Sequence, residues 1–255
     1  MSKQHRAFIA TENEEMASDP CRKISTSYLR KGREIQGHLG KLKKPSNLSN
    51  VLFINKTTDK GGYDARELGY KNVVLMNFAN RHHAGGGYLR GAAAQEEDLC
   101  RCFPQLYRSL YNTDCYSFGL SDVIVTEPTW CVRESSNYKF LPKEKRQTFH
   151  FVSAAAPNVR YGRDKFDSHV EELAFKNVLL APLVKFNLTK PEDTAIVLGA
   201  WGCGAFGNEP EQMAKLMKKV LKVYGGNYGR VIFAVPSFKD RVNYDTFKKV
   251  FGVKD

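Results

Sequence analysis

The chain has 255 residues, enough for one large domain with a sizeable buried core. Its 39 Lys and Arg residues outnumber 27 Asp and Glu residues, and the resulting formal net charge of +12 favours polyanionic partners. The sequence has no run of 18 apolar residues and no apolar segment near its start, which excludes a membrane-spanning helix and argues against a secretory signal.

The six cysteines are scattered and form no C-x-x-C pair. In a chain of this size they indicate reduced thiols, so we expect an intracellular protein, in the cytoplasm or the nucleus. Cys100 and Cys102 lie near His82 and His83 in sequence, but this spacing fits no common zinc site. No metal and no cofactor are therefore expected.

The first 45 residues are predicted to form an N-terminal helical extension. Between Cys21 and Gly40, apolar residues recur at roughly helical spacing among lysines and arginines. Three lysines and a proline in residues 41–46 break that pattern. Residues 46–255 are predicted to form one domain, because no linker or evident repeat divides them.

Within that domain, predicted strands alternate with predicted helices. In chain order they are a strand at 51–54, a turn at 60–62, a helical turn at 65–68, a strand at 73–80, a helix at 92–111 restarted at Pro104, strands at 122–126 and 148–155, a helix at 169–185, a strand at 194–198, a helix at 210–224 and a last strand at 231–235. This alternation predicts an α/β fold with a mostly parallel sheet. The strands at 73–80 and 194–198 run into glycine-rich segments, and ligands bind at such carboxyl ends.

The first glycine segment, Gly85-Gly86-Gly87, is separated by seven residues from Gln95-Glu96-Glu97 at the start of a predicted helix. Glycines let backbone N–H groups approach a ligand closely, and successive amides can point at one anion. A nearby pair of carboxylates suits acid–base cleavage of a sugar bond. The combination predicts an enzyme acting on a phosphorylated sugar or nucleotide, although Gln95-Glu96-Glu97 alone would indicate only a solvated helix start.

The second glycine segment, residues 199–208, contains Gly202-x-Gly204-x-x-Gly207 and so matches the dinucleotide-binding pattern. A Rossmann domain is rejected, because the next strand, at 231–235, ends without an acidic residue to hold a ribose hydroxyl. A P-loop is rejected because no Lys-Ser or Lys-Thr follows either glycine run. What remains is a set of amides at a helix N-terminus that face a phosphate or pyrophosphate.

Together these motifs resemble the microbial type of poly(ADP-ribose) glycohydrolase, a branch of the macrodomain fold. The resemblance rests on the triple glycine with Gln95-Glu96-Glu97, on Asn-Phe-Ala-Asn at 77–80, on Ala-Pro-Asn at 156–158 and on residues 198–208. It implies a macrodomain-like three-layer sandwich, in which helices flank a mixed, mostly parallel sheet. Residues 46–255 would then form an ADP-ribose-binding catalytic domain.

The resemblance also implies a reaction, the hydrolysis of ribose–ribose O-glycosidic bonds in poly(ADP-ribose) from the chain end, with release of ADP-ribose. Glu97 would protonate the departing ribose oxygen and then help to activate water, while Glu96 would hold ribose hydroxyls. Gln95 would fix the geometry, and Asn80 would bond the distal ribose. Both glycine segments would wrap the diphosphate, and Phe206 would pack on the terminal ribose. The residues of the two segments are Gly85, Gly86, Gly87, Gly202, Cys203, Gly204, Ala205, Phe206 and Gly207.

Helix geometry supports a division of labour between the two acids. Adjacent helical residues point about 100° apart, so Glu96 and Glu97 are not expected to flank one bond as a glycosidase pair does, with carboxyls roughly 5–9.5 Å apart. One carboxylate is therefore expected to act largely alone. Tyr88 and Arg90, next to the triple glycine, are further candidates for ligand contact, whereas Trp201 is expected only to pack.

Two other functions fit the same residues: removal of single ADP-ribose groups, and binding of ADP-ribose without cleavage. The presence of Glu96 and Glu97 argues against a pure binder, which gains little from two carboxylates beside a diphosphate. The expected partners are poly(ADP-ribose) or ADP-ribosylated proteins, with ADP-ribose as product. Nucleic acid is a further candidate through the basic surface alone, and no membrane partner is expected.

Overall fold

The computed structural model describes residues 1–16, 26–29, 35, 37–237 and 240–253. Its strands are β1 (Thr26–Leu29), β2 (Val51–Ile54), β3 (Asn72–Phe78), β4 (Val123–Trp130), β5 (Thr148–Ala154), β6 (Thr194–Leu198) and β7 (Arg230–Ala234). Its α-helices are α1 (Lys3–Met16), α3 (Leu39–Leu42), α4 (Thr58–Glu67), α5 (Gln95–Cys102), α6 (Pro104–Tyr111), α7 (Ser168–Lys185), α8 (Pro210–Tyr224) and α9 (Val242–Phe251). Short 3-10 turns include η2 (Tyr88–Arg90).

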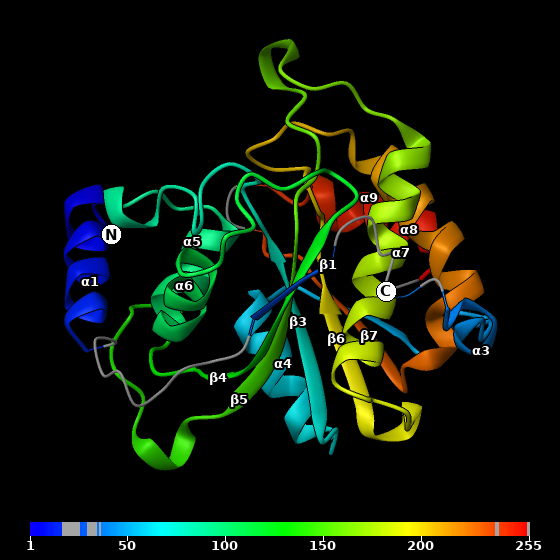
Figure 1. Ribbon diagram of the computed structural model, residues 1–255, viewed down its shortest axis with the longest axis horizontal. Helices are drawn as coiled ribbons and strands as arrows, with labels where there is room; N and C mark the ends of the chain where they lie inside the picture. Colours follow the sequence, from blue (N-terminus) through cyan, green and yellow to red (C-terminus); the bar gives the residue numbers. More distant parts are fainter. Residues whose placement is uncertain (17–25, 30–34, 36, 238–239, 254–255) are drawn as a thin grey trace.

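The strands described above form one sheet in the order β1-β4-β5-β3-β6-β7-β2, with helices on both of its faces (Figure 1). Strands β5, β3, β6, β7 and β2 run parallel to one another, whereas β4 is antiparallel to both of its neighbours, β1 and β5. The predicted fold class is confirmed: the molecule is an α/β three-layer sandwich with a mixed, mostly parallel sheet.

Strand β3 shows why its sequence is apolar throughout. Val73 and Leu75 pack into the core shared with α4, α5 and α6, whereas Val74 and Met76 pack into the core shared with α7, α8 and α9. Successive side chains of a strand point to opposite faces, so a strand covered on both sides shows no alternation of polar and apolar residues.

The predicted strands at 51–54, 73–80, 122–126, 148–155, 194–198 and 231–235 are confirmed, as are the helices at 169–185 and 210–224. The helix predicted at 92–111 begins at Gln95 and is divided into α5 and α6, with Pro104 at the first position of the second helix. The C-terminal helix α9 was not predicted.

The predicted turn at 60–62 is wrong, because Gly61 and Gly62 lie inside helix α4. A methyl group on Gly61 would lie 2.9 Å from Cγ1 of Val197, and one on Gly62 would lie 2.9 Å from the ring of Phe149. The two glycines therefore allow α4 to approach the sheet closely, and they do not mark a change of chain direction.

The helix predicted between residues 21 and 40 is wrong over Thr26–Leu29, which form strand β1. This strand pairs with β4, with Thr26 opposite Thr126 and Leu29 opposite Val123. The rest of that prediction lies largely outside the described residues. Helix α1, which precedes it, lies within the helical extension predicted for residues 1–45, although the apolar spacing placed a helix only between residues 21 and 40. The division of the chain at residue 45 stays a prediction.

The described cysteines are free thiols: Cys100, Cys102, Cys115 and Cys131 are buried and Cys203 is partly buried. Nowhere in the described part of the chain is there a helix of the length and apolarity that crossing a bilayer requires.

Candidate active site

The parallel strands end at one edge of the sheet, and the segments that follow them surround a cleft of about 1280 Å³. Asn55, Phe78, Ala156 and Val235 line it from the ends of β2, β3, β5 and β7. The second glycine segment lines it after β6, and the first turn of α5 closes another side through Gln95 and Asp98. The cleft exceeds the roughly 300–1,000 Å³ typical of drug-sized ligands, so it suits a long, dinucleotide-like molecule.

Helix α5 places the predicted acids at its own start. Ala94, just before the helix, has an extended backbone, and its N–H donates to Oε2 of Glu97 at 3.0 Å. Glu97 thus reaches back to the residue that caps its helix, as a glutamate at the third helical position commonly does. Glu96, Glu97 and Asp98 all lie in this first turn, where negative charge is favourable.

The three amides of the first glycine segment are all used inside the protein. The Gly87 N–H donates to Oε1 of Glu97 at 2.8 Å, and the Gly86 N–H donates to the carbonyl of His83 at 3.0 Å. The backbone of Gly85 hydrogen-bonds to Glu96. The predicted phosphate cradle is therefore not what these amides form: the anions they face are the carboxylates of α5.

Gly86 lies where the two carboxylates meet. A methyl group on it would lie 2.6 Å from Oε1 of Glu97 and 3.1 Å from Oε2 of Glu96, and its φ of +56° is one that side chains disfavour. Although adjacent helical residues diverge, Glu96 and Glu97 thus both reach the same loop residue. This contact explains the glycine at position 86, whereas a methyl group on Gly85 would lie 2.6 Å from the ring of Tyr107 and one on Gly87 would lie 2.7 Å from Cβ of Ala92.

Glu96 is 3 % exposed and is held by the strand ends. Its Oε2 accepts the N–H of Asn80 at 2.8 Å, and its Oε1 accepts from the amide of Asn77 at 3.5 Å. Burial raises the pKa of Glu96 well above its usual range, and the neighbouring Glu97 carboxylate adds to that rise. The hydrogen bonds from Asn80, Asn77 and Gly85 oppose it. Glu96 is thus biased toward its neutral, protonated form.

Gln95 fixes α5 to the sheet and to α4. Its Nε2 donates to the carbonyl of Met76 at 2.7 Å and to Oγ1 of Thr58 at 3.0 Å, while its Oε1 accepts the N–H of Phe78 at 2.9 Å. The side chain therefore uses both ends of its amide within the protein. Its predicted part in fixing the geometry of catalysis stays a prediction.

Asn80 turns the chain out of β3. Its Oδ1 accepts the N–H groups of His82 at 2.8 Å and His83 at 3.1 Å, and its own N–H holds Glu96. Asn80 therefore shapes the start of the first glycine segment, and its predicted contact with a ribose stays a prediction.

The second glycine segment carries unpaired donors. The N–H groups of Gly202, Gly204, Ala205 and Phe206 bond to none of the residues that the structure describes, whereas those of Cys203 and Gly207 close turns on Ala200 and Gly204. Asn208 braces the segment, because its Nδ2 donates to the carbonyls of Pro157 at 2.7 Å and Gly202 at 3.1 Å. These open amides beside the cleft are able to bind an anion, and the cradle that the sequence predicted there stays a prediction.

Gly204 and Phe206 of this segment line the cleft, and Trp201 is buried. A methyl group on Gly204 would meet no atom within 4 Å, so nothing in the protein requires a glycine there and the space above it belongs to the cleft. Phe206 is partly buried and also lines the cleft. Trp201 is fully buried and its indole N–H donates to the carbonyl of Ala154, consistent with the packing role expected of it.

Sequence reasoning missed a second carboxylate on the cleft wall. Asp98 accepts a hydrogen bond from the hydroxyl of Tyr138, and both residues line the cleft. Burial raises the pKa of Asp98 to about 6, against the lowering effect of that hydrogen bond. In the sequence, only its position in the first turn of α5, immediately after Glu97, could have indicated that Asp98 belongs to the site.

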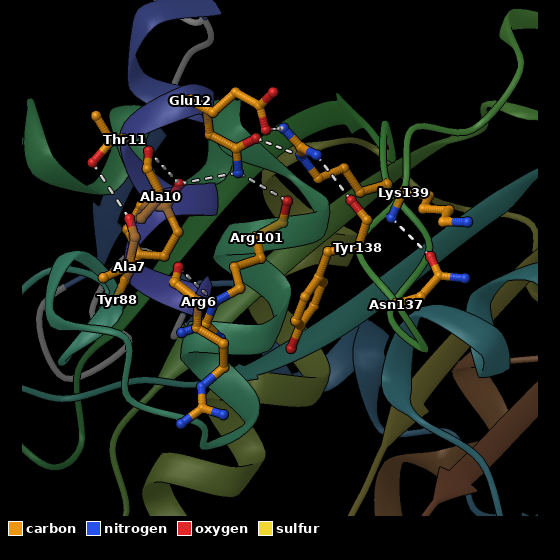
Figure 2. Close-up of polar contacts among 12 residues, drawn as sticks. Arg6, Ala7, Ala10, Thr11, Glu12, Tyr88, Arg101, Asn137, Tyr138 and Lys139 are labelled. Carbon is orange, nitrogen blue, oxygen red and sulfur yellow. Dashed lines mark hydrogen bonds and ion pairs between the residues drawn. The ribbon is translucent and has the colours of Figure 1, made fainter. Parts of the chain in front are cut away.

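The network around helix α1 was also missed, and it overturns one predicted contact. Tyr88 is 1 % exposed and lies beneath α1, so it faces neither the cleft nor solvent. Figure 2 shows Tyr88 and Arg101 gathered against this helix. Asn13 connects them, because its Nδ2 donates to the hydroxyl of Tyr88 at 3.1 Å and to the carbonyl of Arg101 at 3.0 Å. Helix α1 thereby holds the segment after the triple glycine.

Residues 10–122 match the family model for the catalytic domain of microbial-type poly(ADP-ribose) glycohydrolase. The chain is similar to this family over these residues, which are fewer than half of its length. The family resemblance inferred from the motifs is thus confirmed, and the match contains the first glycine segment and the head of α5. The second glycine segment lies outside the matched residues. None of the curated proteins searched matches the chain.

Solved structures of poly(ADP-ribose) glycohydrolases share this fold. The enzyme from Thermomonospora curvata is 24% identical with a TM-score of 0.77, and the match covers 97% of this chain and 99% of that one. The enzyme from Deinococcus radiodurans, in complex with ADP-ribose, is 25% identical with a TM-score of 0.74, and the match covers 89% of this chain and 94% of that one. The T. curvata enzyme bound to the inhibitor ADP-HPD gives a TM-score of 0.74 at 24% identity.

Proposed function

We propose that the protein is a poly(ADP-ribose) glycohydrolase, a glycosidase that hydrolyses ribose–ribose O-glycosidic bonds from the chain end and releases ADP-ribose. One observation carries the proposal: the first turn of α5, which holds Glu96 and Glu97, lines through Gln95 and Asp98 the same long cleft that the unpaired amides of the second glycine segment line. A solved relative holds ADP-ribose, a ligand with a diphosphate between two riboses. The match to the family model supports the same assignment.

In this proposal the diphosphate binds the amides of Gly202, Gly204, Ala205 and Phe206. Backbone N–H groups that are already oriented bind an anion without further reorganisation. Phe206 packs on the terminal ribose. Binding there directs the adjoining sugar toward the head of α5 across the cleft.

Glu97 acts on the sugar as the catalytic acid, protonating the departing ribose oxygen and then helping water to attack the oxocarbenium-like carbon. Its two oxygens are held by the N–H groups of Gly87 and Ala94, which fixes the direction of the carboxyl group. Glu96 holds ribose hydroxyls of the substrate. Gln95 and Asn80 hold these acids, and Asn80 reaches the distal ribose.

The test compares the wild type with Glu97→Gln, and with Glu211→Gln as control. Glu211 is an exposed residue of α8 paired only with Lys215 among its described neighbours. With labelled poly(ADP-ribose), we expect the wild type and the control to release ADP-ribose and Glu97→Gln to be slower by about 100-fold or more, the usual contribution of a positioned acid. Equal rates for the wild type and Glu97→Gln would remove Glu97 from the reaction. If the wild type releases ADP-ribose from mono-ADP-ribosylated protein but not from the polymer, the substrate is a single ADP-ribose group and not poly(ADP-ribose).

A binding experiment tests the cradle separately. In Gly204→Val the added Cβ has no protein atom within 4 Å and lies at the cleft, whereas in Gly40→Val, on helix α3, the added Cβ is equally unhindered but does not line the cleft. We expect the Kd for ADP-ribose, measured by calorimetry, to rise at least about tenfold in Gly204→Val, because the side chain displaces the diphosphate from the amides. Gly40→Val should bind as the wild type does. Unchanged binding by Gly204→Val would place the nucleotide elsewhere.

A further inference from the structure

A second cavity, of about 380 Å³, lies beside the first glycine segment. Gly86 and Gly87 form part of its wall, but none of its lining residues belongs to the large cleft. The side chains around it are aromatic or can donate hydrogen bonds: His82, His83, Arg90, Tyr107, Tyr111 and Tyr116. Nothing in the proposed binding of the diphosphate uses this cavity.

The carboxyl group of Glu97 lines neither cavity, but hydrogen bonds connect it to the walls of both. Its Oε2 accepts the N–H of Ala94, which lines the large cleft, and its Oε1 accepts the N–H of Gly87, which lines the small cavity. Each oxygen is thus one hydrogen bond from a residue of a different cavity. The two cavities therefore approach this buried acid through different neighbouring residues.

Cleavage within a polymer needs room for ligand on both sides of the acid. The acid protonates the oxygen that joins two units, so one unit must lie on each side of it. The large cleft, with its open amides, accounts for the unit that is released. The unit that remains on the polymer carries an adenine ring and two further phosphates. When bound, it must lie on the other side of the acid from the released unit.

The small cavity has groups that fit such a nucleotide. Tyr111 is 67% exposed and lies beside Tyr107, with ring centroids 5.8 Å apart, which offers an aromatic face to a base. Arg90, His82 and His83 are exposed and can donate to phosphate oxygens. The buried hydroxyl of Tyr116 has no hydrogen-bond partner among the described residues, so it is free to meet a polar group of a ligand.

We propose that this cavity binds the adenosine diphosphate moiety of the unit adjoining the scissile bond, with the adenine on Tyr111 and the phosphates near Arg90 and the two histidines. The proposal rests on the proposed function for its choice of ligand. It makes the enzyme read two successive units of the polymer, one in each cavity.

The test measures binding in the Glu97→Gln background, so that the ligand is not consumed. The probes are ADP-ribose and a purified fragment of two ADP-ribose units, and the quantity compared is the ratio of their Kd values. We expect the two-unit fragment to bind more tightly, and Tyr111→Ala to reduce this advantage about fivefold or more, which is the weaker end of what stacking on an aromatic ring contributes. Tyr111→Phe, which keeps the ring, should retain the advantage.

Trp130→Ala serves as the matched control. Trp130 is 43% exposed and pairs with Thr148 at the beginning of β5, at the opposite edge of the sheet from the acids. Its replacement should leave the ratio unchanged. The proposal is overturned if the two-unit fragment binds no better than ADP-ribose, or if Tyr111→Ala keeps the full advantage. Either result overturns it even if the active control, Glu211→Gln, hydrolyses the polymer and so supports the proposed function. If Glu211→Gln releases no ADP-ribose from the polymer, the proposed function fails. If Tyr111→Ala nevertheless abolishes the tighter binding of the two-unit fragment, the cavity is still a binding site.

Discussion

Gly86 is required by its neighbours, because any side chain there would collide with the carboxyl groups of both Glu96 and Glu97. The sequence correctly associated the triple glycine with these acids, but it assigned the amides to a bound phosphate. A glycine run indicates that backbone must approach an anion closely. It does not distinguish a ligand's anion from one supplied by the next helix, so this part of the site could not be predicted.

Glu171 is a buried carboxyl group outside the site. It lies on α7, is 0 % exposed, and neither of its oxygens has a hydrogen-bond partner among the described residues. Burial raises the pKa of Glu171 to about 8, with smaller contributions from the nearby carboxylates of Asp167 and Asp164. The folded protein therefore holds this proton more tightly than the unfolded chain does.

The consequence is a loss of stability as pH rises. Between the unfolded pKa, near 4.5, and the folded value of about 8, each step in pH favours the unfolded state, which ionises first. We expect Glu171→Gln to remove part of this dependence, so that the variant gains about 1 kcal/mol or more relative to the wild type between pH 5 and pH 8. Urea unfolding at the two pH values measures this. A parallel loss in both proteins would show that another group is responsible.

At the scale of elements, helix α1 lies within the helical extension predicted for residues 1–45, but its bounds and its contacts were not predicted. Its inward face is partly polar, because Asn13 is fully buried and Glu12 and Glu14 form ion pairs with Arg133 and Arg108. Periodicity of apolar residues, the main sequence signal for a helix, is therefore weak here. The partners lie on α6 and in the segment after β4, so the contacts that stabilise α1 are distant in sequence. A single sequence does not show such pairs.

Asn13 makes three buried hydrogen bonds, to the hydroxyl of Tyr88, to the carbonyl of Arg101 and from Nε of Arg133 at 2.7 Å. We expect Asn13→Leu to lower the free energy of unfolding by about 2 kcal/mol or more, because it leaves buried partners unsatisfied. Hydrolysis of the polymer should slow as well, since Tyr88 directly follows the triple glycine. Denaturant unfolding and the rate of ADP-ribose release measure the two effects.

Thr11→Ala is the control for this change. Thr11 is exposed on the same helix and its hydroxyl bonds only to the carbonyl of Ala7, one turn earlier, as Figure 2 shows. Its loss should change stability by less than about 0.5 kcal/mol, as is usual for surface positions. If Asn13→Leu behaves like Thr11→Ala, helix α1 does not stabilise the first glycine segment.

For the molecule as a whole, the sequence predicted the layered fold because the inner strands are buried on both faces and the helices between them are amphipathic or long. Its failures lie at the margins. Strand β1 has four residues and depends on pairing with β4, and the reversal of β4 is not visible in its apolar run. Edge pairings of this kind are set by tertiary contacts more than by local preference.

The net charge of +12 is also a property of the whole chain. We expect the affinity of Glu97→Gln for long poly(ADP-ribose) to fall steeply between 50 and 200 mM salt. Its affinity for single ADP-ribose should fall much less, because one diphosphate contacts few cationic groups. Filter binding at several salt concentrations gives the two slopes. Equal slopes would mean that the basic surface takes no part in holding the polymer.

The pair of glycines inside α4 has a consequence for the acids. Because Gly61 and Gly62 have no side chains, helix α4 packs closer to the strands than larger residues at these positions would allow. The first residue of α4, Thr58, accepts a hydrogen bond from Gln95, so the position of α4 affects the position of helix α5. Two positions with no chemistry of their own thus help to set where the carboxyl groups of α5 lie relative to the sheet.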